Sequence, residues 1–155
     1  MIHVWRLTRR VHAARPRDAY SGAGAERAGG RWNEAGTRAA YAASTRSLAA
    51  LEYLANVDPE ELPNDLVFVG ATFEEHDLVV GHPPDGWDSL DAPAARSYGQ
   101  EWLRAGRSLV LAIPSAIVRA ERNYVINPQS ARVKALRVVP DVEDFVFDGR
   151  LLRRR

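Results

Sequence analysis

The amino-acid sequence predicts a single α+β domain. Its 155 residues are an ordinary length for one domain and are enough to bury a core without disulfide or metal cross-links. Short apolar runs typical of β-strands are interspersed irregularly with segments that have the period of an α-helix. That irregular order favours a mixed α+β domain over a regular array of βαβ units. We therefore expect one domain over residues 1–155, with a frayed carboxyl end.

The strands are expected where apolar residues alternate or run continuously. HVWRL, at 3–7, alternates so that Val4 and Arg6 lie on the face opposite Trp5. DLVFVGATF, at 65–73, is a short apolar run after a cluster of turn residues, and it is the clearest strand in the chain. The further predicted strands span 38–44, 108–115, 133–139 and 144–152.

The first predicted helix spans 47–57 and ends before a proline. Either Ser44 or Thr45 precedes it as the N-cap, because a side-chain oxygen there can accept a hydrogen bond from the first helical turn. Its apolar face is formed by Leu48, Leu51 and Ala55. Glu52 lies at the border of that face, so we expect its side chain to be half-buried.

A second helix is predicted over 92–105, where Tyr98, Trp102 and Leu103 fall on or near one side. The segment 15–30 contains proline, serine and several glycines but no periodic apolar face. We therefore expect 15–30 to form a loop or a series of turns.

Several chemistries are excluded or disfavoured by residues that the chain lacks. It has no cysteine, which rules out disulfides, thiolate metal sites and a cysteine nucleophile. It has no GxSxG elbow, P-loop or Rossmann glycine motif. The histidines, which lack the spacing of metal ligands, are His3, His12, His76 and His82. Hydrolase triads, nucleotide kinases and zinc enzymes are therefore disfavoured, and we expect no metal cofactor.

The charge balance argues against a protein that binds polyanions. The chain carries 21 basic and 20 acidic residues, and the arginines are dispersed along it. No segment approaches the ~18 consecutive apolar residues of a membrane span, and the amino terminus lacks the apolar core of a signal peptide. We therefore expect a cytoplasmic protein without direct nucleic-acid or membrane binding. A non-enzymatic nucleic-acid-binding module stays as an alternative.

The first candidate functional segment is GGRWN, residues 29–33. Paired glycines allow the backbone to approach a ligand closely, and Arg31 directly after them can meet an anion with a bidentate fork. The structural alternative is a tight turn with Arg31 in solvent and Trp32 in the core.

Further candidates are Glu52, Tyr41 and the polar residues of two later segments, IPSA at 113–116 and NYVINP at 123–128. A carboxylate beside an apolar face can stabilise a cationic transition state, although Glu52 is as readily interpreted as solvated. Tyr41 lies among alanines and can stack on a planar ligand or pack in the core. Ser115 and the two asparagines of 123–128 can line a pocket or cap turns. Without a strong base, this inventory suits cleavage of an activated bond, such as an N-glycosidic link to a cationic leaving group.

Taken together and in this order, the motifs resemble the RES domain family, toxins of bacterial type II toxin–antitoxin modules named for arginine, glutamate and serine. The matching stretches are WRL with Arg6, GAGAERAGGRWNEAG, YAAS followed by SLAALE, YGQEWL, and IPSAIVRAERNYVINP. They extend over most of the chain. One departure is Gln100, which stands where an acidic residue is common in the family.

The resemblance implies a mixed, mainly antiparallel split sheet with flanking helices, similar to ADP-ribosyltransferases, and an enzyme that cleaves the nicotinamide–ribose bond of NAD+. The acceptor that it implies is water, inorganic phosphate or a protein. The implied catalytic residues are Arg31, Tyr41 and Glu52. The implied binding residues are Arg6, Arg31, Tyr41, Ser44, Ser115 and Asn127.

In that interpretation Arg31 and Arg6 hold phosphate groups and Tyr41 packs against the nicotinamide ring. Glu52 orients the ribose hydroxyls and stabilises the oxocarbenium-like cation. The implied partner is an Xre-like helix-turn-helix antitoxin that blocks the active site, and a toxin homodimer within that complex is compatible with the family. An RNA-cleaving toxin is the alternative enzyme, and it would need a histidine or lysine beside the acidic centre.

Overall fold

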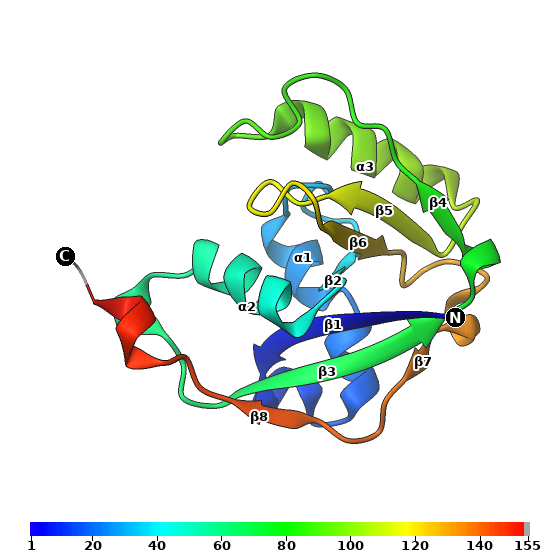
Figure 1. Ribbon diagram of the computed structural model, residues 1–155. Helices are drawn as coiled ribbons and strands as arrows, with labels where there is room; N and C mark the ends of the chain where they lie inside the picture. Colours follow the sequence, from blue (N-terminus) through cyan, green and yellow to red (C-terminus); the bar gives the residue numbers. More distant parts are fainter. Residues whose placement is uncertain (154–155) are drawn as a thin grey trace.

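The computed structural model describes residues 1–153, in which eight strands form one curled, mixed sheet with helices packed against it (Figure 1). The strands are β1 (Ile2–Arg9), β2 (Ala40–Ala43), β3 (Leu66–Phe73), β4 (Leu78–Val80), β5 (Val110–Pro114), β6 (Arg122–Ile126), β7 (Arg137–Val138) and β8 (Glu143–Phe145). Their order is β4-β5-β6-β2-β1-β3-β7, and β8 also pairs with β3. Within residues 1–153 every pair except β4–β5 is antiparallel, which confirms the predicted mixed, mainly antiparallel sheet.

The sheet is split between β1 and β2. Strand β1 pairs with β3 over its whole length, whereas its register with β2 is limited to the pair Trp5↔Ala43. Strand β2 belongs to the other half of the sheet, because all of its residues pair with β6. The two halves therefore meet at one residue pair and diverge beyond it, as the predicted split sheet requires.

The α-helices of residues 1–153 are α1 (Ala23–Ala28), α2 (Arg46–Ala55) and α3 (Pro93–Ala105). Helix α2 packs beside β1 and β2, and α3 lies over the β4–β5–β6 end of the sheet (Figure 1). Short 3-10 turns span Arg10–Ala13, Pro16–Tyr20, Pro59–Glu61, Glu75–Asp77, Val133–Ala135 and Gly149–Leu152. The site described below lies where α2 faces the end of β5 and the start of β6.

The two faces of β1 belong to different apolar clusters. Val4 is buried with Val67 and Val69 of β3 in one cluster. Trp5 and Leu7 pack in another cluster, against α2. The alternation predicted for β1 is therefore confirmed. In the other half of the sheet, α3 packs on β5 and β6 through a cluster that includes Ala95, Leu103, Leu111, Ile113 and Val125.

Helix α2 begins as predicted but buries a different face. Thr45 is the N-cap, since its hydroxyl oxygen accepts a 3.0 Å hydrogen bond from the Leu48 amide. Leu48 is buried with Ala49, whereas Leu51 is 41% exposed. The predicted apolar face was therefore wrong for Leu51 and for Ala55, which is also exposed. The helix is turned so that Glu52 reaches polar partners on the sheet, and the expected half-burial of Glu52 is confirmed.

The remaining differences concern short elements. The predicted loop 15–30 contains α1 and a 3-10 turn. None of the residues of α1 is buried, so it leaves no apolar period in the sequence. Strands β4 and β6 were not expected, and the predicted strand 133–139 is a 3-10 turn followed by the two residues of β7. The predicted strand 144–152 was wrong beyond residue 145, where β8 ends, and its last residues form the 3-10 turn Gly149–Leu152. Such short elements are fixed by pairing with neighbouring strands rather than by local pattern.

Candidate active site

The carboxylate of Glu52 joins α2 to the residue that follows β5 and to the start of β6. Its Oε1 accepts hydrogen bonds from the Ser115 hydroxyl at 2.8 Å and from the Asn123 amide at 2.5 Å. In residues 1–153 the other carboxylate oxygen, Oε2, has no hydrogen-bond partner. Because Glu52 is only half-buried, that second oxygen is available to a ligand.

The orientation of the Ser115 hydroxyl is determined by its neighbours. Ser115 is fully buried, and its Oγ accepts hydrogen bonds from the amides of Ile117 and Val118, both at 3.0 Å. A hydroxyl has one proton and two acceptor lone pairs, so its proton is directed to Glu52. Ser115 therefore acts on the carboxylate, and its oxygen is not free to serve as a nucleophile.

The strand register explains why Asn123 and Tyr41 share a face. Asn123 pairs with Ala43 of β2 and with Ile113 of β5, while Tyr41 pairs with Val125. Side chains of paired residues point to the same side of a sheet, so Tyr41 lies diagonally from Asn123 on that face. Helix α2 packs against Ala43, and the small side chain of Ala43 leaves room for Glu52 to reach Asn123.

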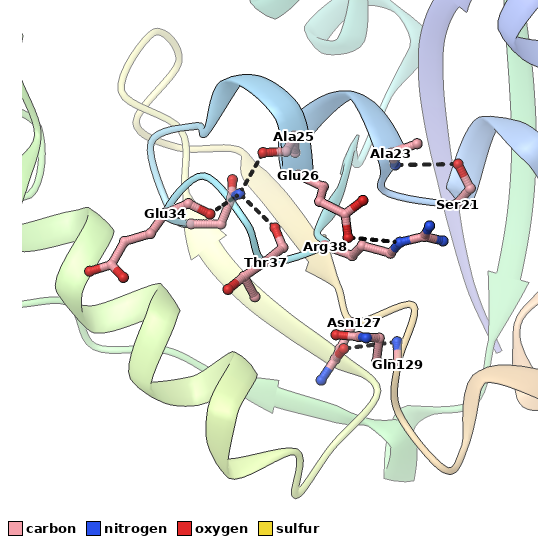
Figure 2. A network of polar contacts seen from close by, with 10 residues as sticks. Ser21, Ala23, Ala25, Glu26, Glu34, Thr37, Arg38, Asn127 and Gln129 are labelled. Carbon is pink, nitrogen blue, oxygen red and sulfur yellow. Dashed lines mark hydrogen bonds and ion pairs between the residues drawn. The ribbon is translucent and has the colours of Figure 1, made fainter.

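The glycine loop is organised by the fully buried side chain of Asn33. Its Nδ2 donates to the carbonyl oxygens of Ala25, Glu34 and Thr37 at 2.9 to 3.1 Å, and Figure 2 shows these three residues around the loop. Its Oδ1 accepts a 2.5 Å hydrogen bond from the Tyr41 hydroxyl. Asn33 thus ties α1 and the loop to β2, a role that GGRWN alone did not reveal.

Tyr41 is held at its hydroxyl by the same loop. Besides donating to Asn33, the hydroxyl oxygen accepts a 3.2 Å hydrogen bond from the Trp32 amide. Burial raises the pKa of Tyr41 well above its usual range, so the phenol stays neutral near pH 7. A Cβ added to Gly30 would lie 2.7 Å from the Tyr41 hydroxyl oxygen, so only glycine fits there without movement.

Arg6 lies at the split of the sheet, directly after the single β1–β2 pair. Its Nη1 donates to the Tyr41 carbonyl at 2.9 Å, while its buried Nε has no hydrogen-bond partner among residues 1–153. Burial lowers the pKa of Arg6 from its usual range, an effect opposed by nearby tyrosines. Arg6 also lines a cavity of about 270 Å³ together with Thr8, His12 and Arg27. Glu52 is not among the residues that line this cavity.

Arg31 contacts the loop that precedes α3. Its Nη1 donates to the carbonyl oxygens of Trp87 at 3.1 Å and Ser89 at 2.9 Å. The same loop is held from the other side, where Arg119 forms a 2.6 Å ion pair with Asp88. The loop therefore links the glycine loop to the turn that follows Ser115. In residues 1–153 Nε and Nη2 of Arg31 have no hydrogen-bond partner.

The structure does not bring all the sequence-predicted residues into one set of contacts. Within residues 1–153, no hydrogen bond or ion pair joins Glu52 to Arg6, Arg31 or Tyr41. The Ser44 hydroxyl has a long, 3.5 Å contact to Glu121.

Asn127 lies beyond the far end of β6 from Asn123, where its amide donates to the Leu103 carbonyl and its Oδ1 accepts from the Gln129 amide (Figure 2). The asparagine that contacts Glu52 is Asn123. It lies in the same sequence motif as Asn127, and strand alternation alone does not distinguish the two because they are four residues apart.

Gln100 stands at a buried position between α3 and the glycine loop. Its Oε1 accepts a 2.9 Å hydrogen bond from the Glu34 amide, and its Nε2 donates to the Thr37 hydroxyl at 2.8 Å. Both ends of the amide are used, so the departure from the family pattern is accommodated.

No cluster of three His, Cys, Asp or Glu side chains arranged to hold a metal ion occurs within residues 1–153. None of the helices in this part of the chain has the length and hydropathy needed to cross a lipid bilayer.

Comparison with known proteins gives one family. Residues 3–148 match the RES domain. The chain belongs to the RES domain family. Its relatives include the "Prs ADP-ribosylating toxin" of Sphingobium sp. (strain YBL2), which is 36% identical over 88% of this chain and 89% of that protein. "Toxin Res" of Photorhabdus laumondii is 33% identical over 98% of both chains, and "Toxin Res" of Yersinia enterocolitica is 33% identical over 96% of this chain and 98% of that one.

The RES domain match covers every element that builds the site, from β1 through β8. The predicted family, a RES domain toxin, is therefore confirmed. The residue roles that the resemblance implied stay predictions, and the contacts above show which of them have a structural basis.

Proposed function

We propose that this RES domain toxin cleaves the nicotinamide–ribose bond of NAD+. The observation that carries the proposal is the Glu52 carboxylate, which has Oε1 fixed by Ser115 and Asn123 and Oε2 free. A relative named as an ADP-ribosylating toxin supports it, because ADP-ribosyl transfer begins with breakage of that bond. The family assignment itself supports a toxin.

The proposed reaction needs no strong base. Nicotinamide leaves as a neutral molecule with the electron pair of the C–N bond, and positive charge develops on the ribose. A preorganised carboxylate oxygen beside that charge lowers the barrier electrostatically, because it needs no reorganisation when the charge forms. Glu52 supplies that oxygen in the proposal, and no covalent enzyme intermediate is required. The acceptor then adds to the ribose carbon and loses its proton.

The other residues are assigned to substrate binding. Arg6 lines a cavity, and two nitrogens of Arg31 have no hydrogen-bond partner in residues 1–153, so both guanidinium groups are assigned to phosphate oxygens. Tyr41 is neutral and held at its hydroxyl, which leaves its ring as a platform for the nicotinamide. These assignments follow the family resemblance and stay predictions.

Histidine does not accompany the acidic centre, which weakens the alternative of an RNA-cleaving toxin. Within residues 1–153 no histidine side chain bonds to Glu52, and His76 instead contacts Arg132 and Asp77. Acid–base cleavage of RNA requires a proton donor or acceptor within hydrogen-bond reach of the reacting atoms.

The test is product analysis. Purified protein is incubated with NAD+ alone, with inorganic phosphate, and with a cell extract, and the products are identified by mass. Free nicotinamide is expected, together with ADP-ribose, phosphorylated ADP-ribose or a modified protein according to the acceptor. Absence of nicotinamide release under all three conditions would overturn the proposal.

We further propose that a helix-turn-helix antitoxin covers this site. An enzyme that depletes NAD+ would harm its own cell, and two exposed apolar side chains, Leu51 beside Glu52 and Ile117 after Ser115, offer a surface for a protein partner. The complex with a co-expressed antitoxin encoded next to the gene is expected to leave NAD+ intact, whereas the isolated toxin consumes it. Equal rates with and without the antitoxin would contradict the proposal.

A further inference from the structure

Glu52 has two side-chain hydrogen-bond partners in residues 1–153, Ser115 and Asn123, and Asn123 is the one that keeps an unpaired polar atom. Its Nδ2 donates the 2.5 Å hydrogen bond to Oε1, while its Oδ1 is buried and has no hydrogen-bond partner in the described part of the chain, residues 1–153. An ionised carboxylate only accepts hydrogen bonds, so the amide nitrogen of Asn123 faces Glu52. Leaving a buried carbonyl unpaired costs about 1–3 kcal/mol, so stability alone does not explain an asparagine here.

The position of Asn123 is equally specific. It lies near the start of β6, and its register partners are Ala43 and Ile113, two apolar residues. An apolar side chain would suit those neighbours better than an amide. The Asn123 side chain has one hydrogen-bond partner there in residues 1–153, the Glu52 carboxylate, which α2 places beside the sheet.

The two donors to Glu52 come from different elements. Ser115 approaches from the end of β5, where two backbone amides fix its hydroxyl, and Asn123 approaches from β6. Two donors on the same oxygen restrict rotation about the last bond of the glutamate side chain more than one donor does. Oε2 is thereby left as the oxygen that can face a ligand.

We infer that Asn123 is a positioning residue: its amide, together with Ser115, fixes Glu52 Oε1 so that Oε2 meets the substrate. The identity of that substrate rests on the proposed function, whereas the hydrogen bond between Asn123 and Glu52 does not. Its essential feature is that Asn123 acts through Glu52. The effect of removing Asn123 must therefore disappear when Glu52 is already disabled.

The test is a double-mutant cycle with Asn123→Leu and Glu52→Gln, in which nicotinamide release from NAD+ is measured for all four proteins. Asn123→Leu removes the donor at similar volume and is expected to lower kcat about 10- to 100-fold, the range for a hydrogen bond to a charged group. KM is expected to change less than about threefold, because Oε2 acts mainly on the transition state. In the Glu52→Gln background the same substitution is expected to cost less than about twofold.

The matched control is Tyr124→Leu, which perturbs the adjacent residue of β6 on the opposite face, in a different apolar cluster. Thermal unfolding of each variant measures any loss of stability separately from activity. Tyr124→Leu is expected to lower the melting temperature and to keep kcat within about twofold of the parent. A purely structural role for Asn123 would make Asn123→Leu behave like this control.

Growth arrest on expression gives a readout that does not depend on the reaction. If the parent arrests growth but releases no nicotinamide, the proposed function fails, and loss of arrest in Asn123→Leu but not in Tyr124→Leu still supports the positioning role. A kcat for Asn123→Leu within about twofold of the parent, or the same loss in both Glu52 backgrounds, overturns the inference. Unchanged growth arrest by Asn123→Leu also overturns it.

Discussion

The Glu52 cluster and the glycine loop are both dense in hydrogen bonds, but they differ in what they leave unused. Asn33 of the loop has both ends of its amide satisfied and is fully buried. Glu52 is half-buried and keeps one carboxylate oxygen without a partner. Saturated polar groups hold a structure in place, whereas an aligned but unsatisfied group can act on a ligand. The comparison predicts that substitutions in the two regions separate activity from stability.

The largest expected effect is on catalysis at Glu52. Glu52→Gln keeps the shape of the side chain and removes the negative charge, so NAD+ turnover is expected to fall at least about 100-fold, comparable to loss of one electrostatic stabiliser of a transition state. Nicotinamide release and thermal unfolding are measured on the same preparation. A variant that turns over NAD+ near the parental rate would remove Glu52 from the reaction.

The second expected effect is on stability at Asn33. Asn33→Ala removes the hydrogen bonds that the buried amide donates to the carbonyls of Ala25 and Thr37 and the one that it accepts from the Tyr41 hydroxyl. We expect the free energy of unfolding to fall by about 2–4 kcal/mol, as measured by denaturant titration. Thr72→Ala, at a half-buried position of β3, serves as a control with a smaller loss. Equal losses in the two variants would show that the loop does not depend on Asn33.

An intermediate effect is expected at Arg31, because its side chain supports a loop and is also proposed to bind substrate. Arg31→Ala frees the carbonyls of Trp87 and Ser89 and removes a cation proposed to bind phosphate. KM for NAD+ is expected to rise about tenfold, since a lost charge-assisted hydrogen bond costs this much. The loop 82–92 is expected to be cleaved faster by a protease, and the exposed Arg107→Ala is the control for both measurements. An unchanged KM with faster cleavage would show that Arg31 stabilises the loop 82–92 and does not bind NAD+.

The smallest effect is expected at Ser44, which the resemblance placed among the binding residues. Its hydroxyl has only the 3.5 Å contact to Glu121, and Thr45 caps the helix instead. Ser44→Ala is therefore expected to change kcat/KM less than about twofold. A loss of tenfold or more would show that Ser44 binds substrate directly.

The sequence was most informative where a pattern is local. Alternation in β1 separated Val4 from Trp5, and the apolar run of β3 was found with nearly its observed bounds. The N-cap of α2 was narrowed to two neighbouring residues, of which Thr45 is the cap. The hydrophobic pattern of the sequence did not predict α1, which buries no residue, or β6, which is short and begins with polar residues. Local periodicity requires an element long enough to show a buried face.

The candidate site shows the same limit. Glu52, Ser115, Tyr41 and Arg31 were recognised as candidates from their surroundings and their order in the chain. Asn33 was not recognised within GGRWN, and of the two asparagines of 123–128 the binding role was assigned to Asn127 and not to Asn123. Asn123 and Asn127 are four residues apart in one segment and have the same strand parity. The difference between them is the position of α2 over the sheet, which no local signal encodes.

The sequence by itself determined the α+β composition, the RES resemblance, the absence of cysteine chemistry and the position of Glu52 on a helix. The tertiary structure alone decided which hydrogen-bond donors meet that carboxylate, that Arg31 contacts a loop, and which face of α2 is buried. The reason is physical. Hydrogen bonds act over about 3 Å, so they depend on strand register and helix placement, whereas hydrophobic periodicity is written in consecutive residues.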